Sequence, residues 1–525
     1  MPLISRIIRR HAFPIALALG LIAYELLFTW LLANGEPLGT RWLGDTLENS
    51  GDVALYLNEI RQGSWLLKNP FAVEPHLTRF DLVWSTLSVI HGWSKLSPLL
   101  VHELARWVAT VALAFSVHAA ARSVAKDERE ARLASLLAVG GIGLGWLHSA
   151  TLGATGSWTW RTDGAPDIVS EFAVVPTLLG GAHMILSSAL LLYVMRGLWE
   201  VMEHPSRRVW TVMLAIAALT SFHPYFIPLI AAVLFVAWAK HVRDAAHHRV
   251  AVARPLLLAA SFLPSFAYYL WFLTDPLFRT HHLEMNRLPI ASLDRWVFVL
   301  LPAAIAFAWI AIHHARKRLF LKHGRWCTAW LVVAAILTLL LPVPWSRKLT
   351  EGLMIPLVLL TLPFWSALFD SLPRFARGML LAGMVGAVPL HLFASQAAWL
   401  AAPEHARWFN RPEAVFRAWS NLASRPNAVV VSHDLWTNIW TPAWTGKTAW
   451  VGHSHETPDY ERKLAVWREL FNTRDHEIVR FTLQTIPVTH LLLTTKESSE
   501  RMLTLVDDDW EKVFEDNGVT ILERN

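Results

Sequence analysis

Charge and cysteine are scarce in this chain. Only 17% of its 525 residues are Asp, Glu, Lys or Arg, whereas an average soluble domain has about 25%. Hydrophobic residues make up 54%, so the composition predicts lipid rather than water as the main solvent. The single cysteine, Cys327, excludes an intramolecular disulfide and a cysteine-based metal cluster, and it says nothing about the compartment.

Several short catalytic signatures are also missing. The sequence has no H-E-x-x-H pattern, no Walker lysine loop and no G-x-S-x-G elbow. The glycine-rich run VGGIGLGW lacks the preceding strand that a dinucleotide-binding motif requires. Gly141 and Gly145 in this run have G-x-x-x-G spacing, which instead predicts a close approach between two helices.

Runs of apolar residues long enough to cross a membrane recur along most of the chain. We expect about eleven of them. They are Ala12–Ala33, Pro98–Ala120, Leu133–Leu152, Val174–Met195, Val209–Ser221, Pro224–Ala239, Leu256–Leu273, Trp296–Ile312, Trp326–Leu341, Leu353–Phe369 and Gly378–Leu400. The first is too long for a signal peptide and has no evident cleavage site, so it predicts a retained transmembrane helix.

The basic residues predict the orientation of these helices. The net charge of +6 could indicate nucleic acid, but the Lys and Arg residues lie in short clusters between apolar runs. If the helices alternate, every cluster falls on the side of the N-terminus, as the positive-inside rule requires. The clusters lie in the N-terminal segment and in Arg122–Arg132, Arg196–Arg208, Lys240–Arg254, His313–Arg325 and Arg374–Arg377. The sequence therefore predicts no nucleic-acid partner, a cytoplasmic N-terminus, and a first loop and C-terminus outside.

The last 125 residues, 401–525, have the composition of a soluble outer domain. Three short apolar runs predict buried strands: Asn427–His433, Lys447–His453 and Val488–Thr495. Between and after them, helical patterns favour a small α/β sheet. We therefore expect a polytopic α-helical membrane domain over residues 1–400 and an extracytoplasmic α/β domain over residues 401–525.

Local signals predict several boundaries in this outer domain. Thr457 followed by Pro458 has the pattern of an N-cap and first helical residue, for a helix that reaches Phe471. Asp475 is expected to cap a second helix. The dipeptide at 517–518, Asn-Gly between two β-rich runs, predicts a hairpin.

The first outer loop, residues 34–97, is too long to be a simple connector, since loops beyond about 12–15 residues are usually functional or disordered. Its interleaved aromatic and apolar residues argue against disorder. It offers six candidate site residues: Asp45, Asp52, Arg61, Gln62, Glu74 and His76. Transfer chemistry on a sugar needs a carboxylate that accepts a proton from the incoming hydroxyl. Asp52 is our preferred base and Asp45 the second choice, but Asp52 could equally cap a helix from Val53 to Gln62.

Two further groups of residues have a functional and a structural interpretation. Arg347 and Lys348 lie on the outer side, against the positive-inside trend, where cations suit a lipid-linked phosphate; interfacial snorkelling is the alternative. In GHSHETPDY, His453, His455, Glu456 and Asp459 lie close together, and two histidines with a carboxylate could bind zinc. The pattern lacks a third spaced ligand, so we favour a structural loop and predict no metal site there.

These features together resemble the C-type (GT-C) superfamily of integral-membrane glycosyltransferases. GDVALYLNEIRQG, the NPF and EPH that follow it, GGIGLGW, SRKLTEGLMIPL and TGKTAWVGHSHET are similar to pieces of a bacterial branch. The resemblance implies that Asp52, or alternatively Asp45, is the aspartate of the first loop, and that Arg347 and Lys348 bind the lipid phosphate. Several branches carry an adjacent acidic pair in that loop and this chain does not, so a divalent cation as cofactor stays open.

The expected function is therefore that of a multi-pass transferase in the bacterial inner membrane. It would take a sugar, hexose or pentose, from a polyprenyl-phosphate carrier and deliver it with inversion to an extracytoplasmic lipid, glycan or protein. In this scheme Arg61, Gln62, Glu74 and His76 help to bind substrate. A transporter or flippase of lipid-linked saccharide is one alternative, although it would need repeated halves and more charges at mid-membrane depth. An inactive membrane scaffold is the other.

Overall fold

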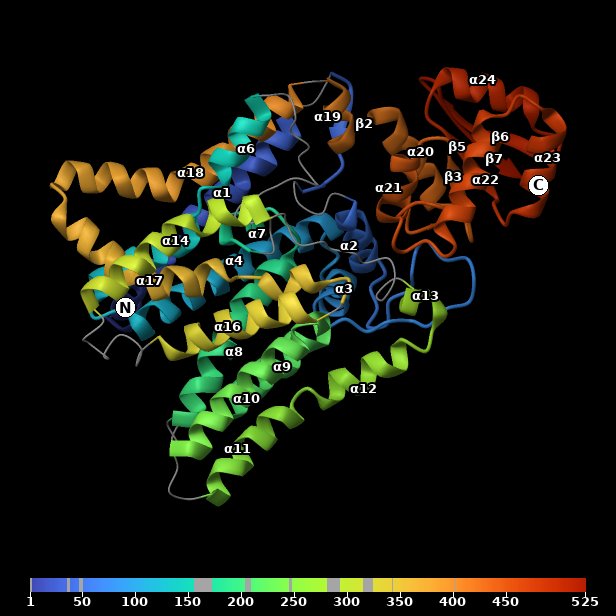
Figure 1. Cartoon of the computed structure of the whole chain (residues 1–525). Coiled ribbons are helices and arrows are strands. Elements are labelled where there is room, and N and C mark those ends of the chain that lie inside the picture. The colour runs from blue at the N-terminus through green and yellow to red at the C-terminus, as the bar shows by residue number, and fades with distance from the viewer. Residues whose placement is uncertain are drawn as a thin grey trace. The chain divides into compact units, whose positions relative to one another are not determined.

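A computed structural model describes residues 2–34, 38–46, 51–154, 172–203, 209–244, 248–280, 293–314, 324–341, 343–401 and 403–525 of the chain. Helices dominate, and the strands lie mainly in the C-terminal part (Figure 1). The chain divides into two compact units, each built from segments that are distant in sequence. The first unit holds Met1–Phe28, Ala105–Leu270 and Arg287–Ala397, and the second holds Thr29–Leu104, Trp271–Asn286 and Ala398–Asn525.

The helices before the C-terminal region are α1 (Pro2–Asn34), α2 (Asp52–Arg61), α3 (Leu82–Ser94), α4 (Pro98–Val124), α5 (Glu128–Gly140), α6 (Gly145–Ala154), α7 (Val174–Leu178), α8 (Ala182–Glu203), α9 (Val209–Phe222), α10 (Ile227–Asp244), α11 (His248–Ala260), α12 (Leu263–Phe272), α13 (Pro276–Thr280), α14 (Leu293–His314), α16 (Arg325–Leu340), α17 (Met354–Ser371) and α18 (Arg374–Leu400), with two short 3₁₀ helices, η2 (Pro224–Phe226) and η4 (Ser346–Thr350). The remaining helices are α19 (Pro403–Phe409), α20 (Glu413–Ala423), α21 (Leu435–Thr445), α22 (Tyr460–Asn472), α23 (His476–Thr485) and α24 (Lys496–Leu505). The strands are β1 (Thr40–Trp42), β2 (Asn410–Pro412), β3 (Val429–Ser432), β4 (Thr448–Ala449), β5 (His490–Leu493), β6 (Trp510–Asp516) and β7 (Val519–Arg524).

The expected membrane helices are confirmed. Within the described ranges, nine helical segments are long and apolar enough to cross a membrane, and Val209–Phe222 and Arg325–Leu340 are two shorter apolar helices. Together these segments coincide with the eleven apolar runs of the sequence. Two runs are interrupted, however. Val174–Met195 is divided between α7 and α8, and Leu133–Leu152 between α5 and α6.

The interruption after α5 corrects the interpretation of the glycine-rich run. Gly141 has a φ of +85° and ends α5, a conformation that glycine adopts easily. The close helix approach occurs one residue earlier. A Cβ added to Gly140 would lie 2.5 Å from Cα of Val385 in α18. Gly140 therefore allows the backbones of α5 and α18 to approach closely. The G-x-x-x-G spacing had assigned this close approach to Gly141 and Gly145.

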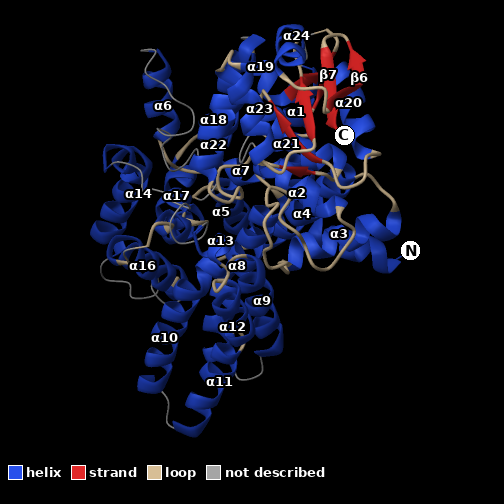
Figure 2. Cartoon of the chain, turned by 90° about the vertical axis from the view of Figure 1, so that its right-hand side faces the viewer, coloured by secondary structure: helices blue, strands red, loops and turns tan. Residues whose placement is uncertain are grey.

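The C-terminal region contains the predicted α/β sheet (Figure 2). Its strand order is β4-β3-β5-β7-β6. β3 pairs in parallel with both β4 and β5, and β7 pairs antiparallel with β5 and β6. A buried apolar core that includes Val431, Leu491 and Leu522 fills the region between the sheet and α22–α24. The fold class expected from the sequence is thus correct.

Two of the three local signals in this region are confirmed. The Asp475 side chain accepts hydrogen bonds from the backbone N–H groups of Glu477 and Ile478 and so caps α23. Asn517 and Gly518, with φ values of 46° and 81°, form the hairpin turn between β6 and β7. The helix start at Thr457 is wrong, because the Thr457 hydroxyl accepts from the Gly452 N–H at 3.2 Å and α22 begins only at Tyr460.

The second unit joins the first outer loop to the C-terminal region. β1 pairs antiparallel with β2, and the Ala449 N–H in β4 donates to the Pro70 carbonyl at 3.0 Å. Phe71 is fully buried and packs with Leu55 of α2 and Ala449. The loop therefore does not fold alone, since its apolar residues are buried against strands and helices that follow more than 300 residues later.

Candidate active site

The helix that carries Asp52 begins at an unusual backbone position. Gly51, with a φ of +94°, occupies the N-cap position of α2, and Asp52 is the first helical residue. The expected alternative, in which Asp52 caps a helix starting at Val53, is therefore wrong. Gly51 has no side chain with which to cap, so the helix start is held by its own backbone and leaves the Asp52 carboxylate available for another partner.

That partner is His453. Asp52 Oδ1 lies 2.7 Å from His453 Nε2, within strong hydrogen-bond distance. The Asp52 side chain is 37% exposed, whereas that of His453 is only 10% exposed. Among the described residues, Asp52 Oδ2 makes no hydrogen bond. The pair thus joins a buried imidazole to a carboxylate side chain that is partly exposed to solvent.

The loop after β4 holds His453 in place. Thr457 and Glu456 donate their backbone N–H groups to the His453 carbonyl at 2.9 and 3.2 Å. The preceding Gly452 lies against Phe71, where an added Cβ would be only 2.7 Å from the ring. His453 follows the carboxyl end of β4, which pairs in parallel with β3. In open α/β sheets, ligands usually bind at the edge formed by the carboxyl ends of parallel strands.

The Asp52 carboxylate shifts the pKa of His453 upward. Burial alone would lower the pKa of His453, but the hydrogen bond and negative charge of Asp52 outweigh it and hold the pKa above its ordinary value. The His453 Nδ1 also accepts a long hydrogen bond, 3.3 Å, from the His455 N–H. The imidazole therefore holds one oxygen of Asp52 in a defined orientation.

A buried ionic cluster supports this pair. The Arg79 guanidinium contacts the Glu59 carboxylate of α2 and lies 3.9 Å from Glu456 Oε1. Asn69 donates to the Glu456 carbonyl at 2.8 Å and to its carboxylate at 3.2 Å. Burial raises the pKa of Glu59, and the neighbouring guanidinium of Arg79 acts in the opposite direction. The cluster ties α2 and the first loop to the same turn that presents His453.

Arg61 and Gln62, predicted to bind substrate, lie at the other end of α2. Arg61 donates from Nε to the Ala443 carbonyl of α21 at 2.7 Å. Gln62 donates to the Lys68 carbonyl at 2.9 Å and accepts from the Lys68 N–H at 2.8 Å. Both side chains hold neighbouring backbone, and their contact with substrate stays a prediction.

Glu74 and His76 lie in the segment after Phe71. Glu74 pairs with the buried Lys463 of α22 at 2.7 Å. His76 Nε2 accepts from the Asn69 N–H at 3.0 Å, and Nδ1 is 2.9 Å from the Glu74 carbonyl. These contacts shape the loop, and a role in substrate binding is likewise still a prediction.

Asp45, the second candidate base, is fully buried, and one carboxylate oxygen accepts the Thr46 N–H at 2.9 Å. A general base must reach the proton that it accepts. Of the two aspartates, Asp52 is therefore the better placed.

Arg347 and Lys348 belong to the first unit and lie in η4, directly before α17. Both are half-buried. The residues that follow them, Leu349, Thr350 and Glu351, are buried. The two predicted phosphate-binding cations are thus half-buried members of a segment whose next three residues are packed into the first unit.

His455 and Glu456, candidates for a zinc site with His453, have other roles. The rings of His453 and His455 lie 5.8 Å apart at a steep angle, and Glu456 faces Arg79 and Asn69. Within the parts of the chain that the structure describes, no three His, Cys, Asp or Glu side chains are placed to hold one metal ion.

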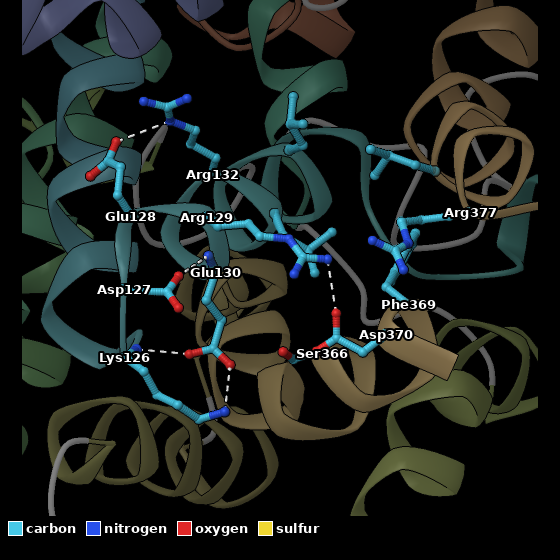
Figure 3. Close-up of a pocket in the computed structure, with 13 residues that line it drawn as sticks. Lys126, Asp127, Glu128, Arg129, Glu130, Arg132, Ser366, Phe369, Asp370 and Arg377 are labelled. Carbon is cyan, nitrogen blue, oxygen red and sulfur yellow. Dashed lines mark hydrogen bonds and ion pairs between the residues drawn. The ribbon is translucent and has the colours of Figure 1, made fainter. Parts of the chain in front are cut away.

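A cavity of about 550 Å³ lies in the first unit, at the start of α5, the end of α17 and the start of α18 (Figure 3). Its charged side chains pair with one another. Arg129 of α5 pairs with Asp370 of α17 at 2.8 Å. Two further pairs lie within one segment, Lys126 with Glu130 and Arg132 with Glu128, each at 3.2 Å. The residues that line it include none of the predicted site residues. Its charges are largely neutralised, so it is not our candidate site.

Sequence reasoning missed the contact between Asp52 and His453. Both residues had been singled out, but as a base and as a weak metal ligand. They are 401 positions apart, and no local pattern predicts that two such segments meet. The pairing of Glu59 with Arg79 was missed for a different reason, because both resemble ordinary charged residues of a surface loop.

Comparison with known proteins supports the fold. The sequence matches no protein-family model and no curated protein. The structure is similar to that of ArnT from Cupriavidus metallidurans, solved with bound undecaprenyl phosphate. The TM-score is 0.51 with 12% sequence identity, over 96% of this chain and 97% of that one. The likeness shows that this chain and ArnT share a fold, and it agrees with the fold class expected from the sequence.

Proposed function

We propose that this protein is a membrane glycosyltransferase that takes a sugar from a polyprenyl-phosphate carrier and transfers it to an acceptor outside the cytoplasm. The shared fold supports a lipid-linked donor, because ArnT was solved with undecaprenyl phosphate. The observation that carries the proposal is the contact of 2.7 Å between Asp52 and His453. This contact supports the proposal because it gives a partly exposed carboxylate of the first outer loop a defined orientation, as a general base would need.

The proposed reaction is a single displacement with inversion. Asp52 accepts the proton of the acceptor hydroxyl while the hydroxyl oxygen attacks the anomeric carbon. The bond from that carbon to the phosphate oxygen breaks, and the carrier leaves as a polyprenyl phosphate. Its negative charge needs cationic partners, and this is the role that we assign to Arg347 and Lys348 in the first unit.

His453 is a positioning residue in this scheme. By donating to Oδ1 of Asp52 it leaves Oδ2 to meet the acceptor hydroxyl. A hydrogen bond donated to a carboxylate lowers the basicity of that carboxylate. The gain in rate must therefore come from the orientation of Asp52, and orientation can account for large factors in rate.

The substrate class can be tested by mass spectrometry of cell-envelope glycolipids and glycans with and without the protein. We expect one species to lose a hexose or pentose, and a copy with Asp52→Asn not to restore it. Identical envelopes in the two strains would contradict the proposal. Accumulation of an intact lipid-linked sugar on the cytoplasmic side would favour the transporter instead.

A further inference from the structure

The first unit contains a buried carboxylate close in sequence to the two predicted phosphate-binding cations. Glu351 follows η4 directly and is fully buried. Its Oε2 lies 3.1 Å from Nε2 of His223, which is also buried. Its Oε1 accepts from the hydroxyl of Ser187 and, at 3.2 Å, from that of Ser188 in α8. An isolated ionised carboxylate at such a place would be very costly, and charged groups in membrane segments are usually paired and functional.

Glu351 and His223 together form one end of a link between η2 and η4. His223 directly precedes η2, and Glu351 directly follows η4. At the other end of the link the rings of Tyr225 and Trp345 pack 5.2 Å apart. Two contacts at separate points prevent one short helix from rotating against the other. We use the name η2–η4 clamp for these four residues: His223, Tyr225, Trp345 and Glu351.

The cations lie inside the clamped segment. The Lys348 carbonyl accepts a hydrogen bond from the Glu351 N–H at 3.3 Å. The Lys348 N–H donates to the Trp345 carbonyl at 2.9 Å. The Thr350 hydroxyl donates to the Arg347 carbonyl at 2.7 Å. Gly352, with a φ of +70°, then leads the chain into α17. A Cβ added to Gly352 would lie 3.4 Å from the Trp330 ring. The backbone from Trp345 to Gly352 is therefore fixed at both ends.

From this arrangement we infer that Glu351 and His223 are positioning residues, which hold Arg347 and Lys348 where a lipid-linked phosphate can bind. The inference rests on the proposed function, because it assumes that these cations meet the donor. It adds residues that do not touch the phosphate. A buried pair suits this role better than a surface contact, because water cannot compete for its hydrogen bonds.

The test is a titration of the full chain in nanodiscs with undecaprenyl phosphate, with KM and kcat for the donor measured in parallel. Glu351→Gln keeps the size of the side chain but releases the clamp. It should raise the Kd of undecaprenyl phosphate and the donor KM about tenfold and change kcat by less than about threefold, because misplacing a binding group by about 1 Å can cost up to roughly 10²-fold. His223→Gln should act similarly, and the double variant should be no worse than either single one.

A matched control distinguishes the clamp from general destabilisation. His118 is another buried histidine of the first unit, 3.4 Å from a Glu128 oxygen, and it lies in α4, away from η4 in sequence. His118→Gln should leave the Kd unchanged. Where Glu351→Gln gives too little folded protein, Ser187→Ala is the milder variant and should still raise the Kd.

The outcomes separate this inference from the proposed function. If Arg347→Gln weakens binding of undecaprenyl phosphate but Glu351→Gln and Ser187→Ala do not, the clamp is overturned and the phosphate site stands. If the double variant with Arg347→Gln and Lys348→Gln also binds undecaprenyl phosphate with an unchanged Kd, both the clamp and the assigned phosphate site are overturned. A fall in kcat with unchanged Kd and KM in Glu351→Gln also overturns the inference.

Discussion

Asp52 and His453, 401 positions apart in the sequence, meet at a distance of 2.7 Å. One comes from the first turn of a helix in the first outer loop, and the other from the turn after strand β4. Both belong to the second compact unit. The loop that carries the proposed base is therefore held by the C-terminal region, which explains why residues 398–525 and the loop form one unit.

Replacing His453 should reduce transfer by releasing the base. We expect His453→Ala to lower kcat by roughly 10- to 100-fold, because an orienting partner of a general base is lost. His453→Gln can still donate a hydrogen bond to Asp52 and should recover part of that loss. The measurement is kcat of the full chain with both variants. Equal activity of wild type and His453→Ala would show that Asp52 needs no partner.

The same pair should make stability depend on pH. The pKa of His453 is raised in the folded state, so its stabilising contribution is fully present below the unfolded value of about 6.5 and is lost as the pH rises through the folded pKa. The difference in Tm between wild type and His453→Gln should be larger at about pH 6 than at about pH 9. Thermal unfolding in detergent measures it. A difference that grows with pH would contradict a raised pKa.

Removing Arg79 should destabilise the second unit strongly. Arg79→Met leaves the buried Glu59 without its cation, and breaking a buried pair in this way costs about 3–5 kcal/mol. Tm should fall by more than roughly 5 °C. Adding Glu59→Gln should restore much of the loss, since no unpaired carboxyl is left.

The exposed pair of Arg129 and Asp370, at 2.8 Å, provides the control. Arg129→Met should change stability by no more than about 1 kcal/mol, as is usual for surface ion pairs. If Arg79→Met were equally mild, the buried cluster would not be what ties α2 to the turn at His453.

Gly452 should tolerate no side chain. An added Cβ would lie 2.7 and 2.9 Å from two ring carbons of Phe71 and 3.4 Å from the Asn438 backbone. Gly452→Ala should therefore displace the His453 turn and lower both Tm and transfer. Gly383→Ala, in a helix with no atom within 4 Å of the added carbon, should leave both nearly unchanged. Loss of Tm without loss of transfer in Gly452→Ala would mean that His453 keeps its position.

The sequence predicts the helices of this protein well, because spanning runs and caps are local signals. Eleven apolar runs, the cap at Asp475 and the turn at Asn517 all depend on residues within a few positions of one another. The errors at Thr457 and Gly141 are also local, because each depends on the conformation of a few neighbouring residues. The Thr457 hydroxyl binds the Gly452 backbone, and α5 ends at the positive φ of Gly141.

The site could be predicted only in part. Asp52 was preferred over Asp45 from its place in the loop, and the exposure of the two side chains, which a sequence does not give, supports the same order. His453, Arg79 and Glu351 acquire their roles from partners in distant segments. Such pairings follow from the packing of the whole unit. Composition and spacing could therefore identify candidate residues but could not predict which of them are in contact.

The most direct test of the account is the rate of sugar transfer by Asp52→Asn, measured with the purified full chain and the donor that envelope analysis identifies. Asparagine has the shape of aspartate and can still contact His453, but it cannot accept the hydroxyl proton. We expect unchanged folding and donor binding with a loss of kcat of roughly 10²- to 10⁴-fold. Transfer at the wild-type rate would remove Asp52 from the role of base and contradict the proposed mechanism.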